Sequence, residues 1–265
     1  MSWLFHHCKK KKFTISNLNQ NKITLLGHGG MGIGKTYPLN SYESISKCLN
    51  SGADGSEMDV QLTKDSVLVA FHDKDLSVNT NMSGIIHSFT RKELKETHYD
   101  QTPYLNYSIV SLEELFFNTS QPQSFTFTFD LKLHSGGDPG YLNQFINQLI
   151  LLIDKYKLAD KACIESKDEN FLKLLQSKRP QYHLFINSDK FETALNSAQQ
   201  LSLYGITLST REVSKSQMQI AHEKNIRVAL WNVHTKKDNQ EAVEKNPDYI
   251  QTDELNHLIN LLNRN

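Results

Sequence analysis

The stretch from Gly52 to Asp73, GADGSEMDVQLTKDSVLVAFHD, decides how the surrounding chain is interpreted. Residues 56–62 have the pattern of a strand, and because side chains alternate between the two faces of a strand, Glu57 and Asp59 share one face. A turn at 63–66 predicts that residues 67–71 run back as a second strand, which ends at His72. Two carboxylates this close repel each other unless a proton or a cation lies between them. We therefore expect a Mg²⁺ or Ca²⁺ site with His72 nearby, although this stretch alone also fits a solvated edge hairpin.

Strand and helix patterns alternate along the rest of the chain. Without the returning strand of the hairpin there are eight strands, at 23–28, 56–62, 124–132, 162–166, 182–187, 205–209, 226–233 and 249–252. Eight strands joined by helices predict an α/β fold, a single (β/α)₈ TIM barrel over residues 23–265, and the length of 265 residues suits it. An open doubly wound sheet is the alternative fold.

Two segments stand apart from this alternation. Residues 1–22 are polar and basic without periodicity, which predicts an N-terminal tail. Residues 75–110 are a long polar segment after the second strand, which predicts a small insertion with one short helix near 91–96. Ser111 and Glu114 then form a capping box that predicts the start of the next helix.

Composition limits the classes of partner. Lys plus Arg equals Asp plus Glu at 29 each, so no net charge attracts the protein to nucleic acid or to an anionic membrane. The three cysteines give neither a disulfide framework nor a zinc pattern. The sequence contains no apolar stretch of transmembrane length and no evident leader, which predicts a cytoplasmic protein; a leader trimmed before Cys8 would instead place it in the cell envelope or periplasm.

Polar side chains follow several predicted strands at their carboxyl ends, which is the face that carries active sites in a (β/α)₈ barrel. His28 ends the first strand, and Asp130 and Lys132 lie two apart on the third. Trp231 lies near the end of the seventh strand, and Asp253 follows the eighth. Together with Glu57, Asp59 and His72 they suit a divalent cation, acid–base groups and a phosphate-containing small molecule.

The segment Gly29–Thr36, GGMGIGKT, matches the phosphate-binding P-loop pattern and follows a strand, as that motif requires. A P-loop also needs a helix that starts at Gly-Lys-Thr. Pro38 disfavours one, because it restricts Tyr37 and lacks an N–H group. A nucleotide-binding protein is therefore the weaker alternative.

The order of these motifs resembles that of glycerophosphodiester phosphodiesterases, a barrel family related to phosphatidylinositol-specific phospholipase C. The family's His-Arg-Gly appears as His28-Gly29-Gly30, and its Pro-Glu-Asn-Thr as Pro38-Leu39-Asn40-Ser41. Its Gly-Ala-Asp-Gly-Glu-x-Asp-Val and Phe-His-Asp appear in the opening stretch. Its Glu-x-Lys, Trp and Thr-Asp appear as Asp130-Leu131-Lys132, Trp231 and Thr252-Asp253. The similarity covers about residues 25–255.

The resemblance implies metal-dependent hydrolysis of a glycerophosphodiester to glycerol 3-phosphate and an alcohol. One divalent cation, Mg²⁺ or Ca²⁺, would be held by Glu57, Asp59 and Asp130. His28 would act as the general base and His72 as the general acid, by analogy with the related phospholipases. Substrate-binding residues would be Lys132, Trp231 and Lys35.

The chain departs from the family pattern at two positions. Gly29 replaces an arginine that binds phosphate, and Leu39 replaces a glutamate of the substrate and metal shell. Lys35 or Lys132 could supply the missing positive charge. A barrel that binds a phosphodiester without cleaving it is the non-enzymatic alternative. The remaining histidines lack a matching partner set and are assigned to structure or surface: His6, His7, His87, His98, His134, His183, His222, His234 and His257.

Overall fold

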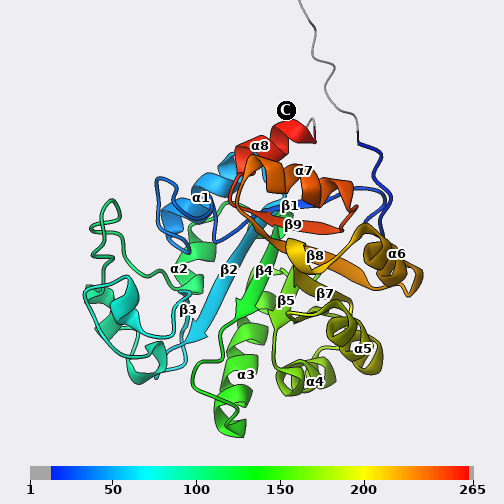
Figure 1. Cartoon of the computed structure of the whole chain (residues 1–265). Coiled ribbons are helices and arrows are strands. Elements are labelled where there is room, and N and C mark those ends of the chain that lie inside the picture. Colours follow the sequence, from blue (N-terminus) through cyan, green and yellow to red (C-terminus); the bar gives the residue numbers. More distant parts are fainter. Residues whose placement is uncertain (1–12, 263–265) are drawn as a thin grey trace, which may run out of the picture.

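The computed structural model describes residues 13–262, in which strands and helices alternate along the chain (Figure 1). Eight parallel strands close into a barrel, because β1 pairs with both β9 and β2. The predicted (β/α)₈ barrel is confirmed. Its strands are β1 (Thr24–Gly27), β2 (Gly55–Leu62), β4 (Thr126–Leu131), β5 (Ala162–Ser166), β6 (His183–Asn187), β7 (Gly205–Ser209), β8 (Arg227–Val233) and β9 (Tyr249–Thr252).

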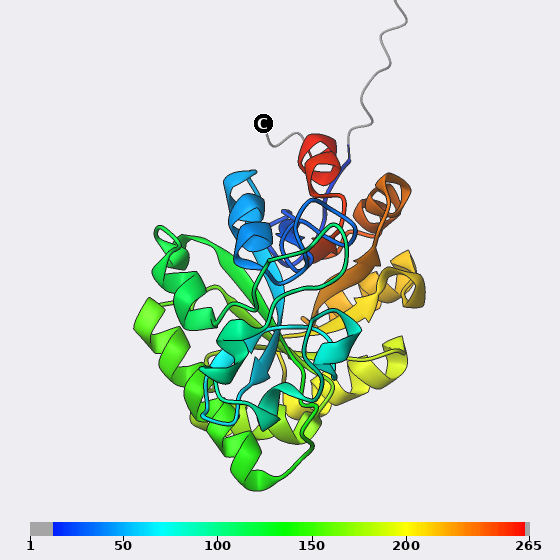
Figure 2. The same ribbon diagram turned by 90° about the vertical axis from the view of Figure 1, so that its left-hand side faces the viewer.

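Helices surround the barrel as a ring, which is seen along the barrel in Figure 2. They are α1 (Tyr42–Asn50), α2 (Leu112–Phe117), α3 (Pro139–Tyr156), α4 (Glu169–Lys178), α5 (Phe191–Leu201), α6 (Lys215–Glu223), α7 (Lys236–Glu244) and α8 (Leu255–Leu261). The predicted capping box at Ser111 and Glu114 is present at the start of α2. No helix among residues 13–262 is both long and apolar enough to cross a bilayer.

The hairpin predicted after β2 is also present. Strand β3 (Leu68–Ala70) pairs antiparallel with β2, so that Val60 lies opposite Ala70. The segment 75–110 that follows contains three short 3₁₀ turns, at Leu76–Val78, Ile86–Ser88 and Glu93–Glu96, where the sequence predicted one helix. These turns share a small apolar core with Phe71 and Tyr99, and the segment lies in front of the barrel opening in Figure 2.

An apolar layer fills the barrel below the polar end. Leu26, Cys163, Phe185, Ala229 and Tyr249 pack together there and are all buried. Because side chains alternate along a strand, residues two positions further along β5, β6 and β8 also point into the barrel, nearer its carboxyl end. The fold thereby places Glu165, Asn187 and Trp231 near the carboxyl end of the barrel interior.

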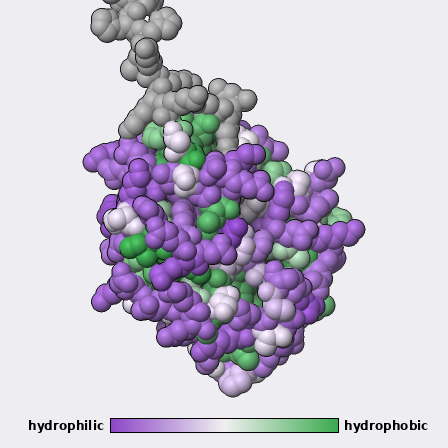
Figure 3. All heavy atoms as spheres, turned by 90° about the vertical axis from the view of Figure 1, so that its right-hand side faces the viewer, coloured by the Kyte–Doolittle hydropathy of each residue, from purple (hydrophilic) through white to green (hydrophobic). Residues whose placement is uncertain are grey.

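Residues 13–22, which fall in the segment predicted as a tail, contain no helix or strand. They nevertheless contact the barrel at its amino end: the Leu18 N–H donates to Asp248 Oδ1 at 2.8 Å, and Asn17 Nδ2 donates to the Pro247 carbonyl at 2.7 Å. The rest of the predicted tail, residues 1–12, lies outside the described chain. This end of the molecule is mostly hydrophilic, with scattered apolar side chains (Figure 3).

Candidate functional site

Three carboxylates meet at the carboxyl end of the barrel. Glu57 and Asp59 point the same way from β2, and Asp59 lies opposite Asp130 of β4 in the sheet register. One oxygen from each residue lies within 4.8 Å of the other two, and Glu57 and Asp59 are each only 2% exposed. We call these three residues the acidic cluster. Closely spaced carboxylate oxygens are the donor set that Mg²⁺ and Ca²⁺ prefer, so the residues present fit a divalent cation.

The charges in the acidic cluster are unequal. Burial and the neighbouring Asp59 charge raise the pKa of Glu57 well above its usual value. Burial also raises the pKa of Asp130. Burial acts on Asp59 in the same direction, but the positive charges of Lys132 and His72 outweigh it and lower the pKa of Asp59. Burial therefore disfavours full ionisation of the cluster, and a bound cation would favour the ionised carboxylates.

Polar neighbours orient the cluster. Lys132 Nζ lies 2.9 Å from Asp59 Oδ1 and 2.7 Å from Asp130 Oδ2, and these two carboxylates raise its pKa despite the opposing effect of burial. Asn40 Nδ2 donates to Asp59 Oδ2 at 2.7 Å, and the Asp59 N–H donates to Asn40 Oδ1 at 2.9 Å. Asn40 lies in the motif Pro38-Leu39-Asn40-Ser41, whose sequence gave no signal of this contact.

His28 is held by a buried aspartate from the other end of the chain. Its Nδ1 lies 2.8 Å from Asp253 Oδ1, and Asp253 is 2% exposed. Burial opposes the charge on His28, but the hydrogen bond to Asp253 and the negative charges of Glu57, Asp253 and Asp59 raise its pKa to about 9. His234, which the sequence analysis assigned to structure or surface, contacts the other Asp253 oxygen through its Nδ1. Asp253 thus joins two histidines.

The glycine-rich loop 29–34 does not form a P-loop. Its backbone N–H groups instead donate hydrogen bonds to the side chains of Glu57 and Asp253. No helix begins at Lys35 or Thr36; the next one, α1, begins at Tyr42 with Ser41 as its N-cap. The Gly29 N–H donates to Glu57 Oε2 at 2.8 Å, and the Ile33 N–H donates to Asp253 Oδ1 at 3.0 Å. The loop therefore links a carboxylate of the acidic cluster to the partner of His28.

Three other predicted site residues lie outside the acidic cluster: His72, Lys35 and Trp231. His72 follows β3 with its side chain 55% exposed, and its Nδ1 lies 2.9 Å from Asp73 Oδ1. Lys35 Nζ pairs with Glu254 Oε1 at 2.5 Å. Trp231 lies on β8 opposite Ser209 of β7, and its buried Nε1 has no hydrogen-bond acceptor within residues 13–262. In that same range no hydrogen bond or ion pair joins Lys35 or Trp231 to the acidic cluster.

Glu165 is an inward-facing carboxyl that the sequence analysis did not select. It lies on β5 opposite Asp130, is 1% exposed, and accepts hydrogen bonds from Thr207 Oγ1 and Gln251 Nε2, each at 2.8 Å. Burial and the charge of Asp130 raise its pKa to about 8. A single acidic residue in an apolar strand pattern gave no signal of this position.

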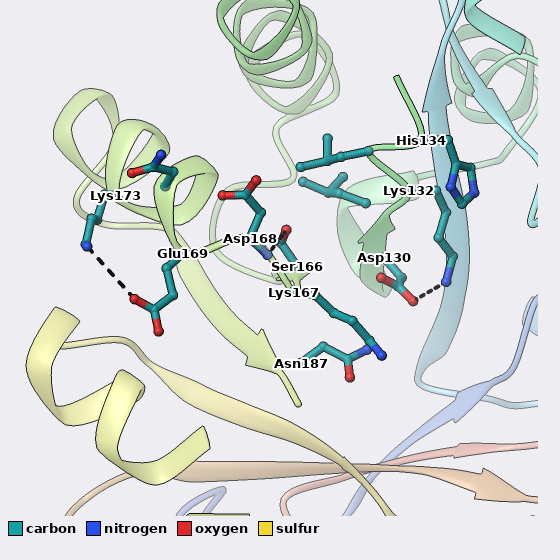
Figure 4. Close-up of a pocket in the computed structure, with 12 residues that line it drawn as sticks. Asp130, Lys132, His134, Ser166, Lys167, Asp168, Glu169, Lys173 and Asn187 are labelled. Carbon is teal, nitrogen blue, oxygen red and sulfur yellow. Dashed lines mark hydrogen bonds and ion pairs between the residues drawn. The ribbon is translucent and has the colours of Figure 1, made fainter. Parts of the chain in front are cut away.

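Two pockets flank the acidic cluster. The larger, of about 760 Å³, opens over β4–β6; we call it the polar pocket (Figure 4). It is lined by Asp130, Leu131, Lys132, Leu133, His134, Ser166, Lys167, Asp168, Glu169, Asn170, Lys173 and Asn187. The smaller, of about 200 Å³, lies between the glycine-rich loop and the insertion and includes Leu39, Phe71, His72 and Tyr99. The polar pocket reaches the acidic cluster through Asp130, and the smaller pocket borders Asn40 and His72.

Comparison with known proteins gives a consistent result. The model of the "Glycerophosphoryl diester phosphodiesterase family" matches residues 31–257, a stretch that begins just after His28. A glycerophosphodiester phosphodiesterase of Caldanaerobacter subterraneus is 25% identical over 250 residues, which cover 92% of this chain and 99% of that protein. One from Bacillus altitudinis is 32% identical over 160 residues, which cover 58% of this chain and 63% of the relative, just under two thirds of its length.

Solved structures of low sequence identity share the fold. A phosphodiesterase of Oleispira antarctica in complex with the product sn-glycerol-3-phosphate is 18% identical and superposes with a TM-score of 0.79, covering 91% of this chain and 96% of that one. A glycerophosphodiester phosphodiesterase of Parabacteroides distasonis is 21% identical, with a TM-score of 0.76 and coverage of 91% and 97%.

Proposed function

The chain belongs to the glycerophosphoryl diester phosphodiesterase family, and we propose that it hydrolyses glycerophosphodiesters to glycerol 3-phosphate and an alcohol with one bound divalent cation, Mg²⁺ or Ca²⁺. The observation that carries this proposal is the buried acidic cluster beside His28. The glycerol 3-phosphate bound to the Oleispira antarctica relative supports the same substrate class.

Glu57, Asp59 and Asp130 would hold the cation. When bound, a divalent cation supplies Lewis-acid polarisation of a phosphoryl oxygen. Lys132 touches two of the three carboxylates, so its ammonium is placed to balance negative charge that develops on the phosphate. Lys132 thereby supplies positive charge near the position where the family has an arginine and this chain has Gly29.

His28 and His72 would transfer the protons. Asp253 fixes His28 through Nδ1, which leaves Nε2 as the ring atom that can meet a substrate oxygen. His72 is held by Asp73 in the same way and is more exposed, which suits the group that protonates an alcohol leaving toward solvent. We therefore keep His28 as the base and His72 as the acid.

The Leu39 side chain occupies the space that a side chain at position 29 would need. A Cβ atom at Gly29, whose φ is +51°, would lie 2.7 Å from Leu39 Cδ2. Leu39 thus packs over the residue that replaces the arginine. Trp231 and Lys35 stay predicted substrate contacts: the buried Trp231 Nε1 would have to become accessible before it could donate to a ligand oxygen, and Lys35 would first have to leave Glu254.

Product analysis tests this function. The protein is incubated with glycerophosphodiesters and Mg²⁺ or Ca²⁺, and products are identified by phosphorus NMR. We expect glycerol 3-phosphate from the wild type and none from Glu57→Ala, whereas Glu192→Ala, a change on exposed helix α5, should behave like the wild type. A wild type that binds the diester without product would favour the non-catalytic barrel, which the loss of the family's arginine and glutamate at Gly29 and Leu39 makes the second candidate.

A further inference from the structure

Asp253 is a buried carboxylate that two histidine rings share. His28 Nδ1 lies 2.8 Å from Asp253 Oδ1, and His234 Nδ1 contacts Asp253 Oδ2. Burial opposes the charge on Asp253, but hydrogen bonds from both rings and the charge of His28 lower its pKa. An ionised carboxylate only accepts hydrogen bonds, so Nδ1 of each ring carries a proton and acts as a donor. His234 therefore holds the carboxylate that holds His28.

The backbone fixes His234 beside this carboxylate. Strands β8 and β9 lie side by side (Figure 1), and Val233 lies opposite Thr252 in their register. The Asp253 N–H donates to the Val233 carbonyl at 3.0 Å. The His234 N–H donates to Asp238 Oδ2 at 3.1 Å, in the first turn of α7. His234 is thus the residue between β8 and α7, and hydrogen bonds on either side of it fix its place.

The two oxygens of Asp253 are held by different donors. His28 and the Ile33 N–H donate to Oδ1, and His234 donates to Oδ2. The torsion that turns an aspartate carboxylate is broad, so donors at one oxygen alone set its orientation loosely. Without His234, Oδ2 would lose this hydrogen bond although Asp253 is only 2% exposed, and a buried charged oxygen turns toward any other donor or water. The His28 ring would turn with it.

We propose that His234 is a positioning residue: it fixes the Asp253 carboxylate, which in turn fixes the His28 ring with Nε2 toward the substrate. The His234 side chain is 37% exposed, so its own Nε2 stays hydrated while Nδ1 is engaged. This inference rests on the proposed phosphodiesterase function, in which His28 transfers a proton. It gives a role to a histidine that the sequence analysis assigned to structure or surface.

Two substitutions at His234 test this role in turnover. His234→Leu removes the donor, whereas His234→Asn keeps one, because Asn Nδ2 is bonded to Cγ as His Nδ1 is. With glycerophosphoglycerol as substrate, we expect His234→Leu to lower kcat by about 10- to 100-fold and to leave KM within about 2-fold of the wild type. His234→Asn should restore most of the lost kcat. His234→Ala takes the place of His234→Leu if the latter does not fold.

The His28 ring can also be observed without turnover. NMR of the ¹⁵N-histidine-labelled chain follows the His28 Nδ1–H proton, which is identified by its absence from His28→Gln. Its hydrogen bond to a buried carboxylate should slow its exchange with water in the wild type and in His234→Asn. In His234→Leu we expect the exchange to be at least about 10-fold faster.

His222→Leu is the matched control. His222 Nε2 lies 2.9 Å from Oδ2 of the fully buried Asp248, which precedes β9 at the amino end of the barrel. This change removes a histidine–aspartate pair of the same kind, so it should lower the melting temperature. It should leave kcat and the exchange of the His28 proton at their wild-type values. Faster exchange in this control as well would show a general loosening of the fold and overturn the proposal.

Three results at His234 itself would also overturn it. They are unchanged kcat and exchange in His234→Leu, equal losses in His234→Leu and His234→Asn, and a raised KM at unchanged kcat, which marks a substrate contact instead. If the wild type binds the diester without cleaving it, the proposed function fails. The proton exchange then decides alone: faster exchange in His234→Leu but not in His234→Asn supports the positioning role, and equal exchange overturns it.

Discussion

Replacing Asp253 by asparagine should lower the free energy of unfolding by an amount that depends on pH. The wild-type His28 pKa of about 9 lies above the ordinary histidine value of 6.5, and Asp253 contributes to that rise through a hydrogen bond and its charge. A histidine with a raised pKa stabilises the fold fully below pH 6.5, and this stabilisation is lost as the pH rises through 9. Asp253→Asn removes the charge and so lowers the pKa of His28.

The size of the effect follows from the same values. A pKa difference between about 9 and 6.5 corresponds to roughly 3 kcal/mol of free energy of unfolding. Asp253 supplies only part of it, because Glu57 and Asp59 also raise the His28 pKa. We therefore expect Asp253→Asn to lower the free energy of unfolding by about 1–2 kcal/mol more at pH 6.5 than at pH 9.5.

Urea unfolding in the presence of a chelator measures this difference directly. Asp189→Asn, which removes a carboxylate that is 77% exposed, is the control and should show little pH-dependent change. Equal destabilisation by Asp253→Asn at both pH values would refute the assigned His28–Asp253 interaction.

Four further substitutions test the site. Glu57→Ala should abolish measurable binding of Mg²⁺ or Ca²⁺ in calorimetry, because two carboxylates rarely suffice for a hard cation; unchanged affinity would contradict the assignment. His28→Ala and His72→Ala should each lower the rate by about 10²- to 10⁴-fold. On a substrate with a nitrophenyl leaving group, only His72→Ala should regain the wild-type rate. If His28→Ala regains it instead, His28 is the general acid and His72 the general base. Gly32→Ala would bring a Cβ atom to 2.3 Å from the Asp253 Cα and should cost both activity and thermal stability. Gly34→Ala also has positive φ but meets no atom within 4 Å, and an equal loss in that control would argue against the clash.

The barrel and the acidic cluster were accessible from sequence because both follow from simple periodicities. Alternation along residues 56–62 placed Glu57 and Asp59 on one face, and the structure has them so on β2. Asp130 could be added because carboxyl ends of parallel strands share one face of a barrel. The glycine-rich loop matches a P-loop pattern, but Pro38 already disfavoured the helix that a P-loop needs, and α1 begins only at Tyr42.

The contacts that sequence reasoning missed join distant parts of the chain. Asp253 reaches His28 only because β9 closes the barrel against β1. The sequence therefore placed Asp253 after the eighth strand without showing its partner, and it assigned His234 to structure or surface. Asn187 follows an ordinary strand pattern. Its Oδ1 is unpaired because none of the described residues places a hydrogen-bond donor beside it. Such features depend on packing in three dimensions, which periodicity does not encode.

The most direct measurement is a cation titration of both binding and turnover on chelator-treated wild type. Glycerophosphodiester hydrolysis and calorimetric binding are followed over the same range of added Mg²⁺ or Ca²⁺. We expect no hydrolysis above background without cation, and activity that rises with the occupancy of a single site. Full activity in the presence of the chelator, or one bound cation without any hydrolysis, would contradict a cation-dependent phosphodiesterase built on Glu57, Asp59 and Asp130.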